Sequence, residues 1–315
     1  MPIDPQVQAL LDAQSAAGNP PLNTMTVAAA RAAAQTPEPE VVPEAVAVVD
    51  ARSIPGPGGK IPVCLYRPKG PDPLPVLVYF HGGGFVLGHL DTYDPWCRHL
   101  ANRVPCLVVS VDYRLAPEHP FPAAVDDSVA ATEWVAAHAA SVGGDSGRLA
   151  VAGDSAGGNL AAVVSQVARD RGAPALAYQV LLCPATDHYD GGTPSYQAYA
   201  TGCGMTRDDV VWLFDHYYPS TVDRDDARAF PLQARDVGGL PPGLVITAEY
   251  DVLRDEGERY ASRLREAGVP TIVSRYDGMV HNFQFSYEAL DSARRAVDEI
   301  VAALRTAFYD VTSPA

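Results

Sequence analysis

Ser155 stands between small residues, directly after an apolar run that reads as a strand. The stretch LAVAGDSAGGNL at 149–160 contains GDSAG, a match to G-x-S-x-G, and a helical pattern begins straight after it. A sharp turn from a strand into a helix strains the backbone of its central residue and needs small residues on both sides. Gly153 and Gly157 therefore predict a turn that presents the Ser155 hydroxyl above the edge of a sheet as a nucleophile.

A second glycine cluster, HGGGFVLG at 81–88, follows the strand-like run VLVYF. Consecutive glycines let backbone N–H groups converge on one point, which is the geometry that stabilises an oxyanion. We expect the N–H groups of Gly83, Gly84 and Ala156 to form this oxyanion hole. A phosphate-binding role is disfavoured, because the cluster matches neither GxGxxG nor GxxxxGK[ST] and no lysine follows it.

The base for such a serine should come later in the chain, because the G-x-S-x-G turn is used in the order serine, acid, histidine. Five of the eight histidines precede Ser155, and His188 and His216 lie in a segment that interrupts the alternation of strands and helices. His281 is the eighth, and it follows the strand-like run TIVSRYDGMV. We therefore expect His281 to be the base.

The acid is expected at the end of the preceding strand. Asp251 comes directly after LVITAEY, which brings it to the same sheet edge as Ser155. Asp255 competes for this role, and Glu249 and Glu256 are nearby. Asp255 lies one helical turn further on, where a carboxylate fits the start of the next helix. Asp251 is therefore the expected acid.

The elements that position these residues form repeated strand and helix units from about residue 75 onward. Most of the strand-like runs are continuously apolar, as in strands buried on both faces of a parallel sheet. They are 74–80, 106–113, 149–153, 178–183, 244–250 and 271–277, and amphipathic stretches lie at 123–140, 157–170 and 255–267. Residues 46–67 predict two earlier antiparallel strands around the turn PGPGGK. The fold class is α/β, with a mostly parallel central sheet flanked by helices.

Two segments depart from this alternation. Residues 3–36 read as one or two helices before the Pro-rich connector TPEPEVVPEAV, and residues 188–230 are Tyr-rich and compatible with helix. We expect both to form a helical cap over the carboxyl edge of the sheet, where ligands bind in open α/β folds; a helical ornament packed elsewhere is the alternative. The expected organisation is one folded unit, with cap helices and connector at 1–45, a catalytic core at 46–187 and 231–315, and the cap insertion at 188–230.

Composition restricts the partners and the compartment. The 315 residues include 23 basic and 38 acidic side chains, a formal net charge of −15 that repels phosphate backbones and anionic membrane surfaces. The amino terminus has no signal-peptide pattern, and no apolar run is long enough to span a membrane. Five cysteines without a CxxC pair predict reduced, packed thiols. We expect no nucleic-acid partner, no membrane insertion and a cytoplasmic location.

Several long motifs in this order resemble the bacterial hormone-sensitive lipase-like esterases, family IV of the α/β-hydrolase superfamily. The motifs are HGGGFVLG, VDYRLAPEHPFPA, GDSAGGNLAA, AEYDVLRDEG and MVHNF, and the resemblance runs from about residue 60 to 305. It implies an α/β-hydrolase fold and a carboxylesterase that acts on short- to medium-chain acyl esters of small molecules through an acyl-enzyme, without a cofactor or a metal. It also implies a homodimer through the edge strand near 271–277.

The resemblance agrees with the triad Ser155, Asp251 and His281, and it gives other motif residues structural roles. His81 looks structural, Arg114 and Glu118 look like a buried ion pair or loop brace, and Asp154 looks like a brace for loops at the site. The sequence HNF at 281–283 replaces the more usual HGF of the family, which keeps the base but changes the backbone requirement after it.

The acyl-chain preference is expected to depend on side chains near the turn and in the cap. The expected pocket residues are Phe85, Leu87, Asp154, Tyr189, Tyr196, Trp212 and Phe214. The tyrosines and the tryptophan of the cap fit a packed core equally well.

Two other functions use the same residues. An amide or N-acetyl deacetylase, or an acyltransferase with an alcohol as acceptor, forms the same acyl-enzyme and is not separated by the motifs. A non-catalytic ligand-binding protein on the same fold is the other alternative, as in the plant gibberellin receptors, which resemble this family and lack the catalytic histidine. The presence of His281 argues against that alternative.

Overall fold

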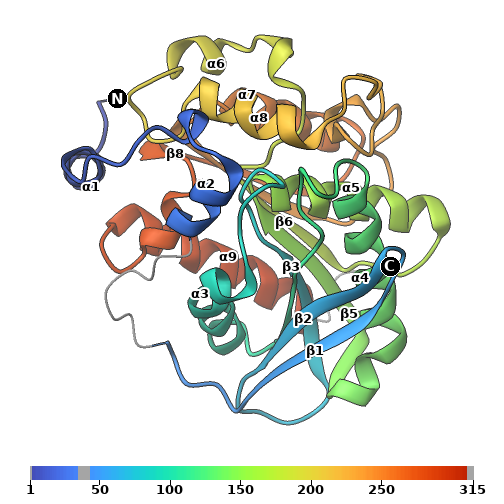
Figure 1. Cartoon of the computed structure of the whole chain (residues 1–315). Coiled ribbons are helices and arrows are strands. Elements are labelled where there is room, and N and C mark those ends of the chain that lie inside the picture. The colour runs from blue at the N-terminus through green and yellow to red at the C-terminus, as the bar shows by residue number, and fades with distance from the viewer. Residues whose placement is uncertain (1, 35–42, 311–315) are drawn as a thin grey trace.

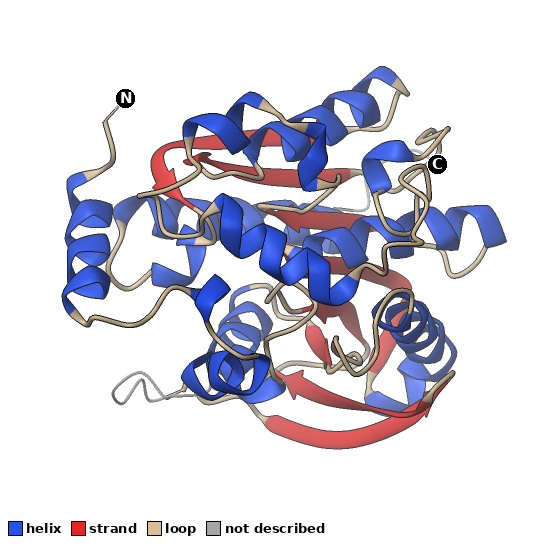
Figure 2. Cartoon of the chain, turned by 45° about the horizontal axis from the view of Figure 1, so that its top comes forward, coloured by secondary structure: helices blue, strands red, loops and turns tan. Residues whose placement is uncertain are grey.

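The computed structural model describes residues 2–34 and 43–310. Most of the Pro-rich connector expected after the first helices lies outside these residues. Figure 1 shows one central sheet with helices around it, and Figure 2 shows helices on both sides of that sheet. The α/β architecture expected from the alternating pattern is confirmed.

The strands of the described residues form one sheet of eight strands, in the order β1-β2-β4-β3-β5-β6-β7-β8. The pairs β1/β2 and β2/β4 are antiparallel, and all other neighbours are parallel. The strands are β1 (Val48–Gly56), β2 (Gly59–Arg67), β3 (Leu74–Phe80), β4 (Leu107–Val111), β5 (Gly144–Asp154), β6 (Tyr178–Leu182), β7 (Gly243–Tyr250) and β8 (Thr271–Val280). Every strand expected from the sequence is present, including the hairpin around PGPGGK.

Helices are present at the three amphipathic stretches expected from the sequence, 123–140, 157–170 and 255–267, and the helices at 90–103 and 291–309 were not predicted. The helices are α1 (Pro5–Ala16), α2 (Val27–Ala34), α3 (Leu90–Arg103), α4 (Ala123–His138), α5 (Ala156–Arg171), α6 (Pro194–Ala198), α7 (Arg207–Tyr217), α8 (Arg254–Glu266) and α9 (Asp291–Tyr309), with short 3₁₀ turns η1 (Leu22–Thr24), η2 (Ala139–Val142), η3 (Tyr189–Gly191), η4 (Pro231–Gln233) and η5 (Phe283–Ser286). No helix of the described residues is long and apolar enough to cross a membrane.

The strand β3 illustrates how the sheet is held between two layers of helices. Its side chains alternate between the two faces. Val76, Val78 and Phe80 join a core that also contains apolar residues of α4, α5 and α8. Leu77 and Tyr79 join a second core built with α3 and α9. Because both faces are covered, all seven residues of β3 are buried, which explains its continuously apolar sequence.

All five cysteines are free and buried, which confirms the expectation of packed thiols. They are Cys64, Cys97, Cys106, Cys183 and Cys203. Burial raises the pKa of Cys64, Cys97, Cys106, Cys183 and Cys203, so these thiols stay protonated at neutral pH.

The amino-terminal helix α2 is fastened to the glycine-rich loop by one arginine. The guanidinium of Arg31 donates to the carbonyls of Val86 at 2.9 Å and Ala116 at 2.7 Å. It also forms a bidentate ion pair with Glu118, in which each guanidinium nitrogen lies 2.8 Å from a carboxylate oxygen. A planar guanidinium can satisfy all of these acceptors at once, which a lysine cannot.

The expected pairing of Arg114 with Glu118 is wrong. Arg114 pairs instead with Asp127 of α4, through two side-chain bonds of 2.8 Å and its own backbone N–H at 3.0 Å. Asp127 is buried and Glu118 is exposed, so the buried carboxylate takes the adjacent arginine and Glu118 reaches out to Arg31. Both residues remain loop braces, with different partners.

We predict that Arg31→Ala lowers the free energy of unfolding by about 1 to 2 kcal/mol, because two backbone carbonyls and one carboxylate lose their donor. Thermal denaturation measures the change, and Arg31→Lys should recover only part of it. Arg103→Ala is the matched control, because its pair with Asp298 is exposed and contributes little. If Arg31→Ala had the same melting temperature as Arg103→Ala, the stabilising role of the Arg31 contacts would be contradicted.

Candidate active site

The turn at Ser155 has the geometry that the two flanking glycines predicted. Ser155 joins β5 to α5 with φ 54° and ψ −117°, a strained conformation for a residue with a side chain. A Cβ atom at Gly157 would collide with the carbonyl of Phe80, and one at Gly153 would collide with the backbone of Gly157. Only glycine fits at both positions. Ser155 itself is buried, with 7% of its surface exposed.

The glycine-rich loop is a tight turn next to this serine. Gly83 and Gly84 have φ 107° and φ 60°, and the Gly83 carbonyl accepts from the N–H of Leu87 at 2.8 Å. A Cβ at Gly83 would collide with the Leu87 carbonyl, so the turn needs glycine there. The N–H of Ala156 belongs to the first turn of α5, where backbone donors have no partner within the helix. The expected oxyanion donors therefore come from this turn and from a helix amino terminus.

The helix α7, from the segment expected to form a cap, packs directly on this loop. The Leu213 side chain fills the space where a Cβ of Gly84 would lie. One turn later, the rings of Tyr217 and Phe85 stack with centroids 3.9 Å apart and an interplanar angle of 12°. The amino-terminal segment lies on α7 in turn, since the N–H of Asn23 donates to Asp209 at 3.2 Å.

The expected acid and base are joined by a hydrogen bond. Asp251 follows β7, His281 follows β8, and Nδ1 of His281 lies 2.8 Å from Oδ2 of Asp251. The other carboxylate oxygen accepts from the backbone N–H of Leu253 at 2.9 Å. Asp251 is 1% exposed, and the His281 side chain is 9% exposed. With Nδ1 donating to the carboxylate, Nε2 is left as the nitrogen that can take a proton.

The three carboxylates that competed with Asp251 have other partners. Asp255 accepts from the N–H of Ser195 in α6 at 2.8 Å, and Glu249 accepts from the N–H of Gly278 at 2.7 Å. Glu256 is fully buried, where it accepts from the backbone N–H groups of Thr186 and Asp187. Burial also raises the pKa of Glu256 well above its usual range. The carboxylate that contacts His281 is that of Asp251.

Asn282 occupies the position where the resembled family usually has glycine. Its φ is 57°, in the left-handed region that asparagine tolerates better than other residues with side chains. Its side-chain amide donates to Asp154 at 2.9 Å. Asn282 therefore adopts a backbone conformation that is also open to glycine, and it makes a hydrogen bond that glycine could not make.

Asp154 connects several loops of the site through hydrogen bonds to its buried carboxylate. Its carboxylate accepts from the hydroxyls of Tyr79 at 2.8 Å and Tyr93 at 3.0 Å and from the N–H of Gly82 at 3.1 Å, besides the amide of Asn282. The side chain has no exposed surface. Burial raises the pKa of Asp154 to about 6, and the hydrogen bonds from the two tyrosines limit that rise.

The expected pocket residues divide by exposure. Phe85 and Asp154 expose no surface, so the pocket role expected for these two is wrong, and both pack between the loop and its supports. Tyr196 and Phe214 are 2% and 4% exposed, and Phe214 packs edge-on against Tyr218. Three residues keep partial exposure, namely Leu87, Tyr189 and Trp212.

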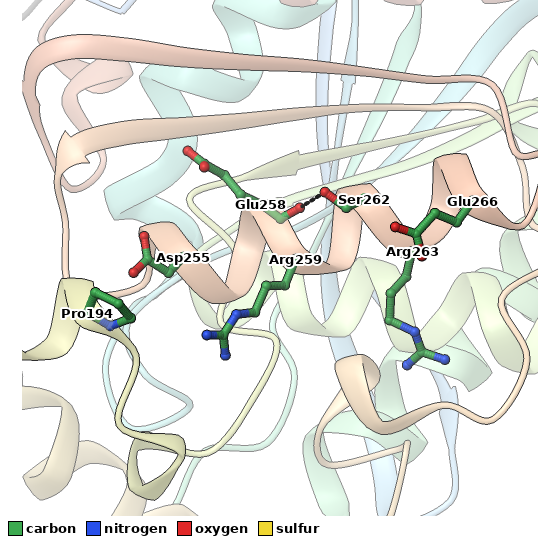
Figure 3. Close-up of a pocket in the computed structure, with 7 residues that line it drawn as sticks. All are labelled: Pro194, Asp255, Glu258, Arg259, Ser262, Arg263 and Glu266. Atoms are coloured by element: carbon green, nitrogen blue, oxygen red, sulfur yellow. Dashed lines mark hydrogen bonds between the residues drawn. The ribbon is translucent and has the colours of Figure 1, made fainter.

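A shallow hollow lies on the outer side of α8, away from these residues (Figure 3). Its lining is mostly charged and includes Pro194, Asp255, Glu258, Arg259, Ser262, Arg263 and Glu266. Neither Ser155 nor His281 belongs to it. The hollow is therefore a surface feature between α6 and α8 and is separate from the candidate active site.

Sequence reasoning missed three residues at the site: Cys183, Leu213 and Asn282 as a hydrogen-bond donor. Within residues 2–34 and 43–310, one group of side chains brings three metal-ligating atoms within 4.8 Å of one another, and it consists of Cys183, Asp251 and His281. Cys183 directly follows β6, as Asp251 follows β7. The search for polar residues at the ends of strands, which identified Asp251, could therefore also have identified this cysteine. Nothing in the sequence marked Leu213.

A serine in a strained turn before a helix, with an Asp–His pair at the ends of later parallel strands, defines an α/β-hydrolase site. The family model described as "alpha/beta hydrolase fold" matches residues 77–285. The carboxylic ester hydrolase LipN of Mycobacterium tuberculosis is 44% identical over 80% of this chain and 69% of its own. The carboxylesterase NlhH of the same organism is 42% identical over 98% of this chain and 97% of its own.

A solved structure agrees with these relatives. An ester hydrolase from the metagenome of Lake Arreo, complexed with a bipyridine phosphonate derivative, has a TM-score of 0.91 and 43% identity, covering 97% of this chain and 99% of its own. The chain belongs to the hormone-sensitive lipase-like family IV of the α/β-hydrolase superfamily.

We predict that Asp154 makes stability depend on pH. Its folded pKa of about 6 lies above that of an ordinary aspartate, so folding takes up a proton between about pH 4 and 6. The stability contributed by this group is complete below about pH 4 and declines as the pH rises to 6. The difference in free energy of unfolding between wild type and Asp154→Asn should therefore fall by about 2 kcal/mol across this range and stay constant above it.

Denaturant unfolding of both proteins from pH 4 to 7.5 measures this difference. Asp208→Asn, which changes an exposed carboxylate, is the control and should show no such decline. A difference that is independent of pH would mean that Asp154 is already charged in the folded protein at pH 4.

Proposed function

We propose that this protein is a carboxylesterase that hydrolyses short- to medium-chain acyl esters with Ser155, His281 and Asp251 as its catalytic triad. The observation that carries the proposal is the 2.8 Å contact between His281 and Asp251 at the sheet edge where Ser155 is held in its strained turn. The carboxylesterase relatives support the same activity.

In the first half of the reaction, Nε2 of His281 removes the proton from the Ser155 hydroxyl as the oxygen attacks the ester carbonyl. Asp251 orients the imidazole and stabilises its positive charge. The imidazolium then gives the proton to the leaving alcohol, which leaves an acyl group on Ser155. In the second half, His281 activates a water molecule that hydrolyses this acyl-enzyme and regenerates the serine.

The negative charge on the carbonyl oxygen is stabilised by three backbone donors in this scheme: the N–H groups of Gly83, Gly84 and Ala156. The positive end of α5 adds to this stabilisation. One such donor commonly contributes about 10²-fold to 10³-fold in turnover. The glycine turn supports this role, because its φ values are open to glycine and closed to most other residues.

The proposed preference for short to medium acyl chains is supported by the packing of the cap. Leu213 lies against Gly84, and Phe85 and Tyr217 stack beside it without exposed surface, so bulky side chains border the loop closely. Leu87, Tyr189 and Trp212 are the remaining candidates for contact with the acyl group.

The proposal predicts a specific result with p-nitrophenyl esters from acetyl to palmitoyl. Wild type should be fastest with the short chains. Ser155→Ala and His281→Ala should each lower kcat by about 10⁴-fold or more, because each removes a member of the triad.

Parallel assays separate the alternatives. Faster cleavage of an N-acetyl amide than of the matching ester would favour a deacetylase, and ester formation with an added alcohol would favour an acyltransferase. A folded wild type that binds these compounds without turnover would favour a ligand-binding protein. Ester hydrolysis by Ser155→Ala at the rate of wild type would contradict the triad assignment.

We further propose that the protein forms a homodimer through β8. This strand is the last in the sheet, and its Ile272 is 49% exposed, which is unusual for an isoleucine. Ile272→Lys should convert a dimer to a monomer in light scattering coupled to size-exclusion chromatography. A wild type that is monomeric at micromolar concentration would contradict the proposal.

A further inference from the structure

Cys183 is the residue that follows β6. Leu182 and Ala185, on either side of it in the sequence, form hydrogen bonds with the backbone of Ser155. The N–H of Ser155 donates to the carbonyl of Leu182 at 2.8 Å, and the N–H of Ala185 donates to the carbonyl of Ser155 at 3.1 Å. The N–H of Cys183 itself donates to the carbonyl of Ile246 in β7 at 2.8 Å. The cysteine is therefore fixed between the serine turn and the strand that carries Asp251.

The backbone of Cys183 is held in a conformation that residues with side chains rarely adopt. Its φ is 43°, in the left-handed region that favours glycine. Such strain persists only where the surrounding structure imposes it, and it clusters at functional sites. At this strained residue the thiol lies close to Asp251 and His281, two members of the proposed triad.

The thiol lies in the interior beside the acid and the base. Cys183 is 1% exposed, and its Sγ, a ring nitrogen of His281 and a carboxylate oxygen of Asp251 all lie within 4.8 Å of one another. A carboxylate offers about four lone-pair sites, and Leu253 and His281 use two of those on Asp251. Asp251 can accept a further donor on this side.

The thiol keeps its hydrogen at neutral pH. Burial, followed by the negative charge of Asp251, raises the pKa of Cys183 well above its usual range, and the charge of Asp154 acts in the same direction. A neutral thiol is a poor nucleophile and a poor metal ligand, but it is a weak hydrogen-bond donor. These properties leave a positioning role for the side chain.

We propose that Cys183 is a positioning residue, whose thiol donates a hydrogen bond to Asp251 and fixes the carboxylate that orients His281. The inference rests on the proposed function, since it concerns the same triad. A donor on Asp251 draws negative charge away from the carboxylate, so it tempers the stabilisation that Asp251 gives to the imidazolium form of His281. Its loss should therefore change both the rate and the pH at which the base becomes active.

The test compares Cys183→Ala, Cys183→Ser and wild type in full pH profiles of kcat and KM. Cys183→Ala should lower kcat about tenfold with little change in KM, equivalent to the loss of one hydrogen bond to a charged group. It should also move the acid limb of the kcat/KM profile to higher pH. Serine is a stronger donor, so Cys183→Ser should keep kcat near that of wild type and move the limb to lower pH.

The control is Cys106→Ala, which removes another fully buried thiol, between α3 and β4, and should leave both kcat and the profile unchanged. Proton NMR adds a readout that does not need turnover: the low-field Nδ1 proton of His281 should shift in opposite directions in the two Cys183 variants. If Cys183→Ala does not fold, Cys183→Ser alone tests the inference. An unchanged acid limb of its kcat/KM profile and an unchanged Nδ1 proton resonance of His281 would then overturn it.

Equal losses in both Cys183 variants with an unmoved profile would also overturn it, because a packing role predicts that pattern. Ser155→Ala belongs in the same series. Its retention of activity would refute the triad itself, whereas an inactive Ser155→Ala together with wild-type behaviour of the Cys183 variants would refute only the role of Cys183.

Discussion

The close approach of the start of α5 to the end of β3 is the constraint on which the site depends. At Gly157 the two segments lie so near each other that a single Cβ would collide with the Phe80 carbonyl. This contact places the serine turn directly beside the glycine-rich loop, which is the continuation of β3. The proposed nucleophile and two proposed backbone donors from a distant part of the chain thus come together because glycines allow backbone to pack on backbone.

Polar contacts then tie the loops of the site to one another. Asp154 accepts from the loop after β3 and from the loop that carries His281, so a single buried carboxylate connects the glycine-rich loop to the segment of the proposed base. Four donors, two of which are tyrosine hydroxyls, offset part of the cost of burying this charge. The pair of Asp251 and His281 follows β7 and β8 at the same edge of the sheet. The loops of the site are thus held together by hydrogen bonds to the buried carboxylates of Asp154 and Asp251.

The sequence predicted those features that follow from local spacing. Continuous apolar runs marked the strands, and their carboxyl ends located Ser155, Asp251 and His281 because parallel strands end at one edge. Partners that depend on three-dimensional packing could not be predicted in this way. Arg114 reaches Asp127 because one turn of α4 faces it, and Asp154 is buried because tyrosines of β3 and α3 cover it. The same packing hides Phe85, whose position in the loop had suggested contact with substrate.

The contact of Leu213 with Gly84 couples two segments that are distant in the sequence. Position 84 has no room for a side chain while a leucine occupies position 213, and position 213 can lose its bulk only by leaving a void over the loop. The amino-terminal segment rests on the same helix through Asn23 and Asp209. A substitution that changes the surface of α7 therefore also acts on the backbone of the glycine-rich loop, so under the proposed function substrate selectivity and oxyanion stabilisation would change together.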